Sequence, residues 1–235
     1  MENWDFREWQ AALGSLDGRE AALVGLAAAE RISGCLGDER FRRHGSSGSA
    51  IVTDLLQMCW NDAANSEESS PAELQVLLDQ LADWSRAYTD LSLAELFRSY
   101  GTQNGDGDDD GDGDGEEGED AVDLDDFVAE AMPEGAVLAH LDALNAVSEA
   151  VATWAGGSWD GALRCLQTAA TAARQGDPQL PGPDVELRRQ REDLELVSAS
   201  GSSERGRVVA GLRARAEADA RGWKQATEQL DLLHD

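Results

Sequence analysis

The clearest metal-binding spacing in this chain lies in one acidic run, residues 105–120, which reads GDGDDDGDGDGEEGED. Ca²⁺-binding loops place carboxylates at alternate positions, followed by a glycine and a closing glutamate. The run fits that pattern in two overlapping registers, as chance provides when almost every residue is Asp, Glu or Gly. The candidate ligands are Asp106, Asp108, Asp110, Asp112 and Glu117. The pattern predicts at most weak Ca²⁺ binding without fixed geometry, and we expect no other cofactor. A protein that responds to Ca²⁺ through this run is one alternative for the function.

A second group of residues could line a pocket for a small ligand or for catalysis. Asp142 and Glu149 lie two turns apart on one expected helix, His140 lies two residues before the first of them, and Glu30 could add a third carboxylate. Histidine and carboxylates are the usual groups of acid–base chemistry. The chain has no HExxH, nucleophile-elbow or dinucleotide-binding motif. We therefore expect a core or rim histidine and solvated or ion-paired carboxylates, with the enzyme or ligand pocket as an alternative.

The net charge restricts the class of partner. The 235 residues include 47 acidic and 19 basic ones, a formal net charge of −28. The acidic run contains ten of these acids, so the rest of the chain is acidic as well. Such a charge repels nucleic acid and anionic membranes and attracts basic proteins. We expect a basic protein partner and neither nucleic-acid nor membrane binding.

Cysteine content and the N-terminal sequence predict a cytoplasmic protein. Cys35, Cys59 and Cys165 are odd in number and far apart, which favours reduced, buried thiols over disulfides. The first ten residues, MENWDFREWQ, lack the basic and apolar stretches of a signal peptide. No run approaches the roughly 20 apolar residues of a membrane span.

Helix caps and apolar positions spaced three and four apart predict an all-α protein. We expect one domain over residues 1–235, an up-and-down bundle of about seven or eight helices, with residues 101–120 as a disordered acidic insertion. Two charged helices, about 185–199 and 204–231, should pack on one narrow side. The other expected helices begin near Trp4, at Asp17, after the Gly/Ser turn 45–49, at Pro71, at Ser92, at Pro133 and at Ser158.

Basic residues gather in one window near the C-terminus. Between residues 188 and 224, nine basic residues face six acidic ones. In so acidic a protein this window is the expected contact for the acidic run, either within one chain or from a second subunit. The second case predicts a salt-sensitive homodimer.

Short motifs along most of the chain resemble one bacterial family. They are Glu30-Arg31, Leu55-Leu56 with Trp60, Leu141-Asp142-Ala143 continuing to Ala146-Val147-Ser148-Glu149, Glu204-Arg205, and Gly211-Leu212-Arg213. With these motifs the chain resembles the uncharacterised proteins of the domain of unknown function 416 family. The resemblance implies a single all-α bundle and no established activity. Two departures are the acidic run, which looks like an insertion, and Ser33, Gly34 and Cys35, which stand where aromatic residues are expected.

Taken together, these features predict a non-catalytic acidic helical protein that binds or neutralises a basic protein, as an adaptor or an immunity-type inhibitor would. The candidate partner-binding or pocket residues are Glu30, Arg31, Trp60, His140, Asp142, Glu149, Glu204 and Arg205.

Overall fold

The computed structural model describes residues 4–38, 46–65, 70–103, 134–174, 181–200 and 204–229. All secondary structure in these ranges is helical, which confirms the predicted all-α class. The helices are α1 (Phe6–Gly14), α2 (Gly18–Ile32), the 3₁₀ helix η1 (Ser33–Gly37), α4 (Ser46–Asn65), α5 (Pro71–Gln103), α6 (Glu134–Gly156), α7 (Trp159–Ala172), α8 (Pro183–Ser198) and α9 (Arg205–Glu228).

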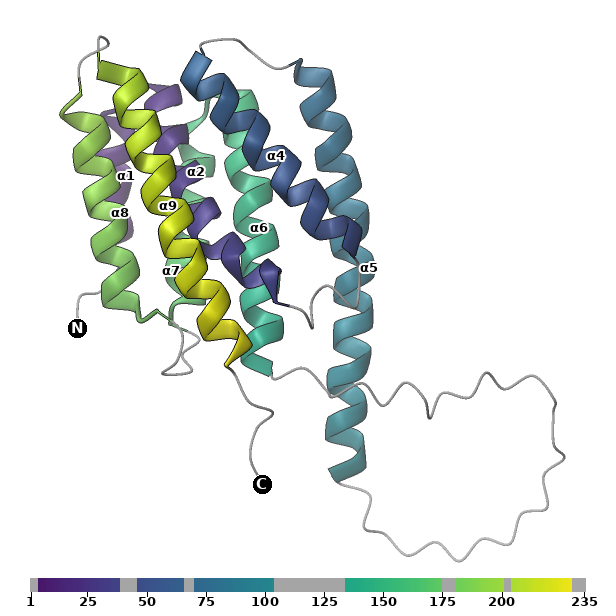
Figure 1. Cartoon of the computed structure of the whole chain (residues 1–235). Coiled ribbons are helices and arrows are strands. Elements are labelled where there is room, and N and C mark those ends of the chain that lie inside the picture. Colours follow the sequence, from purple (N-terminus) through teal and green to yellow (C-terminus); the bar gives the residue numbers. More distant parts are fainter. Residues whose placement is uncertain are drawn as a thin grey trace, which may run out of the picture.

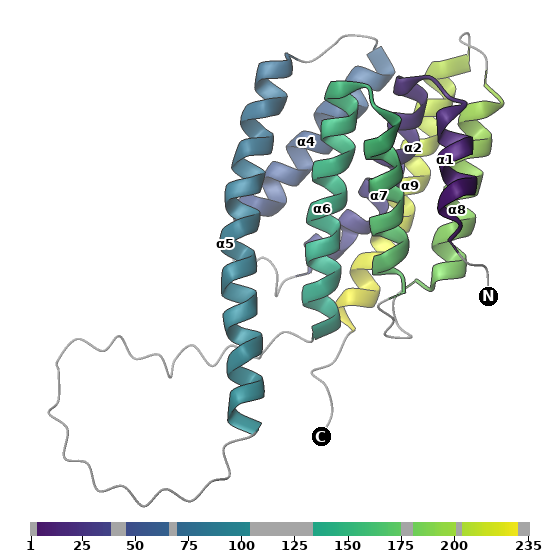
Figure 2. The same cartoon turned by 180° about the vertical axis from the view of Figure 1, so that it is seen from behind.

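Helix α2 is the centre of the bundle. Figure 1 shows α8 and α9 in front of it, and Figure 2, from behind, shows α6 and α7 on its other side. Most of its residues are buried, and many of these are alanines. Small side chains let neighbouring helices approach closely; a Cβ added at Gly25 would lie only 3.2 Å from Ala162 Cα of α7.

The helix starts follow the predicted capping chemistry. Asp17 and Glu20 form a reciprocal capping box at α2, because the Glu20 amide donates to Asp17 Oδ1 at 2.7 Å and the Asp17 amide donates to Glu20 Oε2 at 3.0 Å. Ser158 accepts from the Asp160 amide at 3.3 Å and begins α7. Local sequence therefore determines where these helices begin.

Helix α5 is one long helix where the sequence predicts two. Neither proline nor glycine lies between Tyr88 and Gly101, so Ser92 and Glu95 continue the helix instead of capping a new one. The helix also runs through Gly101 to Gln103, which corrects the predicted start of the insertion at residue 101. The rest of the predicted insertion, with all five candidate Ca²⁺ ligands, lies outside the described residues.

One further prediction about helices was wrong. Residues 46–49, expected to be a Gly/Ser turn, form the first turn of α4. Helices α8 and α9 lie on the same side of α2 and are joined by ion pairs such as Arg189–Asp219, while α9 also packs extensively on α2, η1 and α4. Its charged side chains line only part of its circumference, and its apolar side buries Leu212 and Trp223 completely.

Candidate functional site

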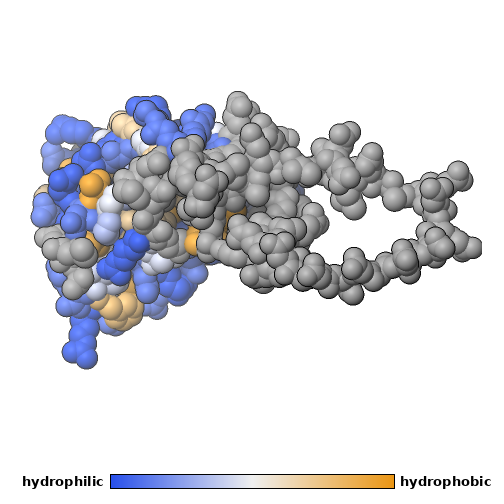
Figure 3. Space-filling model, turned by 90° about the horizontal axis from the view of Figure 1, so that it is seen from below, coloured by the Kyte–Doolittle hydropathy of each residue, from blue (hydrophilic) through white to orange (hydrophobic). Residues whose placement is uncertain are grey.

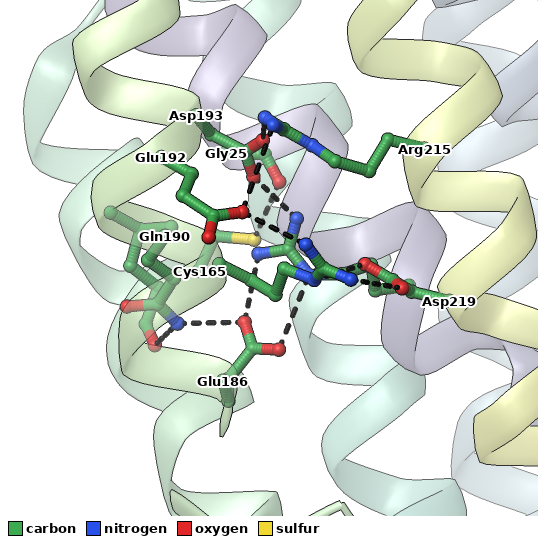
Figure 4. Close-up of polar contacts among 11 residues, drawn as sticks. Gly25, Cys165, Glu186, Gln190, Glu192, Asp193, Arg215 and Asp219 are labelled. Atoms are coloured by element: carbon green, nitrogen blue, oxygen red, sulfur yellow. Dashed lines mark hydrogen bonds and ion pairs between the residues drawn. The ribbon is translucent and has the colours of Figure 1, made fainter. Parts of the chain in front are cut away.

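Arg31, near the end of α2, is fully buried and binds two carboxylates of α8. Its guanidinium donates to Glu186 Oε2 at 3.2 Å and Oε1 at 2.9 Å, and it also pairs with Asp193. Arg215 of α9 pairs with Asp193 as well, and Gln190 Nε2 donates to Glu186 Oε1 at 2.9 Å. Figure 4 shows Glu186, Gln190 and Asp193 of α8 on the side that faces Arg215 of α9. We call this group of residues the Arg31 network.

The Arg31 network buries a residue predicted from the sequence as a candidate for partner binding or for a pocket. Residues 186, 190 and 193 follow helical spacing, so they form a buried face of α8 that is polar instead of apolar. Burial would lower the pKa of Arg31, but Glu186 and Asp193 outweigh it and raise that pKa, so the guanidinium stays charged. Because Arg31 and both carboxylates are enclosed, the network is structural and offers no surface to a ligand.

The predicted pocket of His140, Asp142 and Glu149 is not formed. His140 is fully buried, with its Nδ1 2.8 Å from the Tyr88 hydroxyl, which makes it the expected core histidine. Glu149 pairs at the surface with Arg164 of α7 at 2.8 Å. Within the described ranges, no three histidine, cysteine or acidic side chains are grouped closely enough to hold a metal ion.

Asp142 is partly buried, and burial raises its pKa to about 6. In the unfolded chain the same carboxyl group ionises near pH 4, so its ionisation opposes folding above pH 6. The penalty decreases as the pH falls through 6 and is absent below about pH 4. After allowance for partial exposure, we expect Asp142→Asn to raise the free energy of unfolding by about 1 kcal/mol at pH 7.5.

Urea unfolding of Asp142→Asn and the parent protein at pH 7.5 and 5.0 measures this effect. The stabilisation should fall to about half at pH 5.0. Glu149→Gln is the matched control on the same helix; it removes a surface ion pair and should destabilise slightly or not at all. A stabilisation equal at both pH values would contradict the assignment to Asp142 ionisation.

A cleft of about 420 Å³ lies between α4, α9 and the junction of α2 with η1, and we call it the α4–α9 cleft. Glu30 lines it and accepts from Trp60 Nε1 at 3.0 Å, so two of the predicted candidate residues meet here. Burial raises the pKa of Glu30, and the Trp60 hydrogen bond offsets this in part. Glu30 is thus a half-buried carboxylate in a cleft that remains open to solvent.

The opposite wall of the α4–α9 cleft belongs to α9 and is rich in cations. Arg213, Arg221 and Lys224 line it at spacings of eight and three residues. Arg213 donates to Glu217 Oε1 at 2.8 Å and to Gln57 Oε1 of α4 at 2.7 Å, which joins the two walls. The sequence placed all three cations in the basic window but did not predict a cleft. The sequence feature that could have revealed this cleft wall is the helical spacing of the basic residues along α9.

Gly34 allows η1 to approach α9 at the end of the cleft. A Cβ at this position would lie 1.9 Å from the Ala220 carbonyl oxygen, a backbone atom that cannot rotate away. An aromatic residue, expected here from the family resemblance, would push α9 outward. The glycine therefore fixes the distance between the cleft walls.

Glu204 and Arg205 lie away from the α4–α9 cleft, at the start of α9. Glu204 pairs with Arg207 at 3.1 Å, and both side chains are exposed. Arg205 lines a smaller cleft of about 110 Å³ beside Asp17 and Glu20. The structure thus brings Glu30 and Trp60 together and leaves the other candidate residues in separate places.

All three cysteines are buried free thiols, as predicted. Burial raises the pKa of Cys35 and of Cys59 to about 12, and it raises the pKa of Cys165 as well. Reactive cysteines need an exposed thiolate. None of the three is suited to nucleophilic chemistry.

No protein-family model, no curated protein and no solved structure matches this chain. The resemblance to the domain of unknown function 416 family therefore stays a prediction. Among the helices described here, none combines the length and the apolar character that crossing a membrane requires.

Proposed function

We propose that this chain is a cytoplasmic, non-catalytic interaction protein that binds a basic protein partner, as an adaptor or an immunity-type inhibitor would. The observation that carries this proposal is an excess of carboxylates on α4, α5 and α6. Helix α4 has two acidic residues and no basic ones, α5 has five acidic and two basic residues, and α6 has three acidic residues and neither lysine nor arginine.

Four carboxylates on α4 and α5 are exposed and available to a partner. Asp54, Glu73 and Asp79 point to solvent and, within the described part of the chain, pair with no cation. Asp83 continues the exposed side of α5, and among the described residues its ion pair is a solvent-exposed one with Arg86. Val76, 54% exposed, lies between Glu73 and Asp79 and adds an apolar contact. We call Glu73, Val76, Asp79 and Asp83 the α5 stripe.

Charges on the α8 and α9 side are largely neutralised within the protein. Arg189 binds Glu192 at 2.8 Å and Asp219 at 3.0 Å, and Arg215 pairs with Asp193. This pairing leaves few of the cations in the basic window for the acidic run. A basic partner therefore meets uncompensated negative charge mainly on the α4 and α5 side, where complementary charge accelerates encounter.

The described surface seen from below is mostly hydrophilic, with small separate hydrophobic patches (Figure 3). Obligate interfaces are more apolar than this. That surface is consistent with a polar, salt-sensitive contact. The family resemblance adds only the expectation of the fold.

Affinity capture from a lysate of the source cells tests the proposal. We expect one basic protein in stoichiometric amount, which is then purified and titrated by calorimetry. The triple variant E73Q/D79N/D83N should bind it about tenfold more weakly, since exposed charge contacts contribute up to about 1 kcal/mol each. The loss should shrink as salt is raised.

The matched control is E195Q/E204Q/E228Q, which removes three exposed carboxylates from the α8 and α9 side. It changes the net charge equally and should leave the affinity within about twofold. Equal weakening by both triple variants would indicate general charge attraction and contradict a binding face on α5. Recovery of no basic partner would contradict the function itself.

A further inference from the structure

We propose that the α4–α9 cleft binds a small anionic metabolite with a phosphate or carboxylate group. The site is separate from the partner face, because the α5 stripe does not line it. Three basic residues, Arg213, Arg221 and Lys224, line the cleft beside two acidic ones, Glu30 and Glu217, in a protein of net charge −28. Among the described helices α9 alone has more basic than acidic residues, six against three.

Two cations of the cleft wall are available to an anion. Arg221 is exposed and pairs with no carboxylate within the described residues. Lys224, one turn further along α9, is 44% exposed, and among the described residues its ion-pair partner is Glu228 at 3.6 Å. Like charges at this spacing repel each other, and an oxyanion between them relieves that repulsion while accepting charge-assisted hydrogen bonds.

The rest of the cleft can accommodate a small molecule and not only an ion. Its volume of about 420 Å³ lies in the range of ligand pockets. Val52 and Leu56 of α4 supply apolar lining, and Thr53 supplies a hydroxyl. Trp60 donates to the Oε2 atom of Glu30, and within the described part no group donates to its Oε1 atom. It can accept from a ligand hydroxyl or amino group.

These contacts define the ligand class: an oxyanion at one end for Arg221 and Lys224, and a hydrogen-bond donor for Glu30. Glycerol 3-phosphate has both groups and is the probe, with glycerol as the uncharged comparison. Calorimetric titration of the full chain in 0.15 M salt should show one saturable site with a Kd on the order of 0.1 mM. Glycerol should show none.

R221Q/K224Q should weaken binding of glycerol 3-phosphate at least about tenfold. The control R188Q/R207Q removes two exposed arginines that do not line the cleft, and it should change the Kd less than about twofold. All four substituted side chains are exposed or half-buried, so both variants should fold. Circular dichroism spectra that match the spectrum of the parent protein would verify this.

Three results would overturn the inference: no saturable binding to the parent protein, equal weakening by the two double variants, or binding that appears only after residues 105–120 are deleted. In the last case the acidic run, and not a free metabolite, would be the occupant. None of these titrations involves the basic protein partner. Failure here and failure of the proposed function are therefore distinguishable.

Discussion

Arg31→Met is expected to lower the free energy of unfolding by about 3–5 kcal/mol. The substitution preserves much of the side-chain volume but leaves Glu186 and Asp193 buried, and Glu186 then has no cation among its described contacts. A buried charge without a partner cannot recover its hydration energy. Denaturant unfolding monitored by far-UV circular dichroism measures the loss.

The triple variant R31M/E186Q/D193N separates burial of charge from loss of packing. It replaces the two buried carboxylates that lose Arg31 as their cation, so it should recover a substantial part of the stability that Arg31→Met loses. Arg164→Met provides the surface comparison, because Arg164 is 59% exposed where it pairs with Glu149. It should cost no more than about 1 kcal/mol. An Arg31→Met protein within 1 kcal/mol of the parent would refute the structural role of the network.

Gly34→Ala is the second substitution with a large expected effect, a loss of about 2–3 kcal/mol. The new methyl group would overlap the Ala220 carbonyl of α9, so η1 and α9 must separate. The same displacement would move the cationic wall of the α4–α9 cleft. Thermal and denaturant unfolding measure the stability, and titration with glycerol 3-phosphate reports the change in the cleft.

Gly211→Ala is the matched control for this substitution. Gly211 lies on the exposed side of α9, where an added Cβ meets no atom within 4 Å. Alanine favours a helix over glycine, so this variant should be more stable by about 0.5–1 kcal/mol. If Gly34→Ala were also stabilising, the close approach of η1 to α9 would be wrong.

The fold class could be predicted because it depends on local signals. Asp17 with Glu20 and Ser158 mark helix starts through bonds to amides two or three residues away. Ser92 with Glu95 shows the limit of the same signal. A capping motif begins a helix only where the preceding chain leaves the helical conformation, and nothing in α5 forces it to do so.

The candidate site was harder to predict because it depends on contacts between distant residues. The sequence singled out Glu30 and Trp60 separately, but their hydrogen bond joins α2 to α4 and follows from packing. The Arg31 network was missed for another reason. Residues 186, 190 and 193 have the spacing of a buried face but polar side chains, and apolar periodicity does not detect such a face.

The Arg31 network also has a consequence for the order in which the chain folds during synthesis. Arg31 is made early, whereas its partners Glu186 and Asp193 follow 155 and 162 residues later. Until α8 leaves the ribosome, the α2 face that contains Arg31 must stay hydrated, because a lone guanidinium cannot be buried. The side of α2 that carries Arg31 can therefore be buried only after α8 is available, and a chain that stops before residue 186 leaves that side open and hydrated.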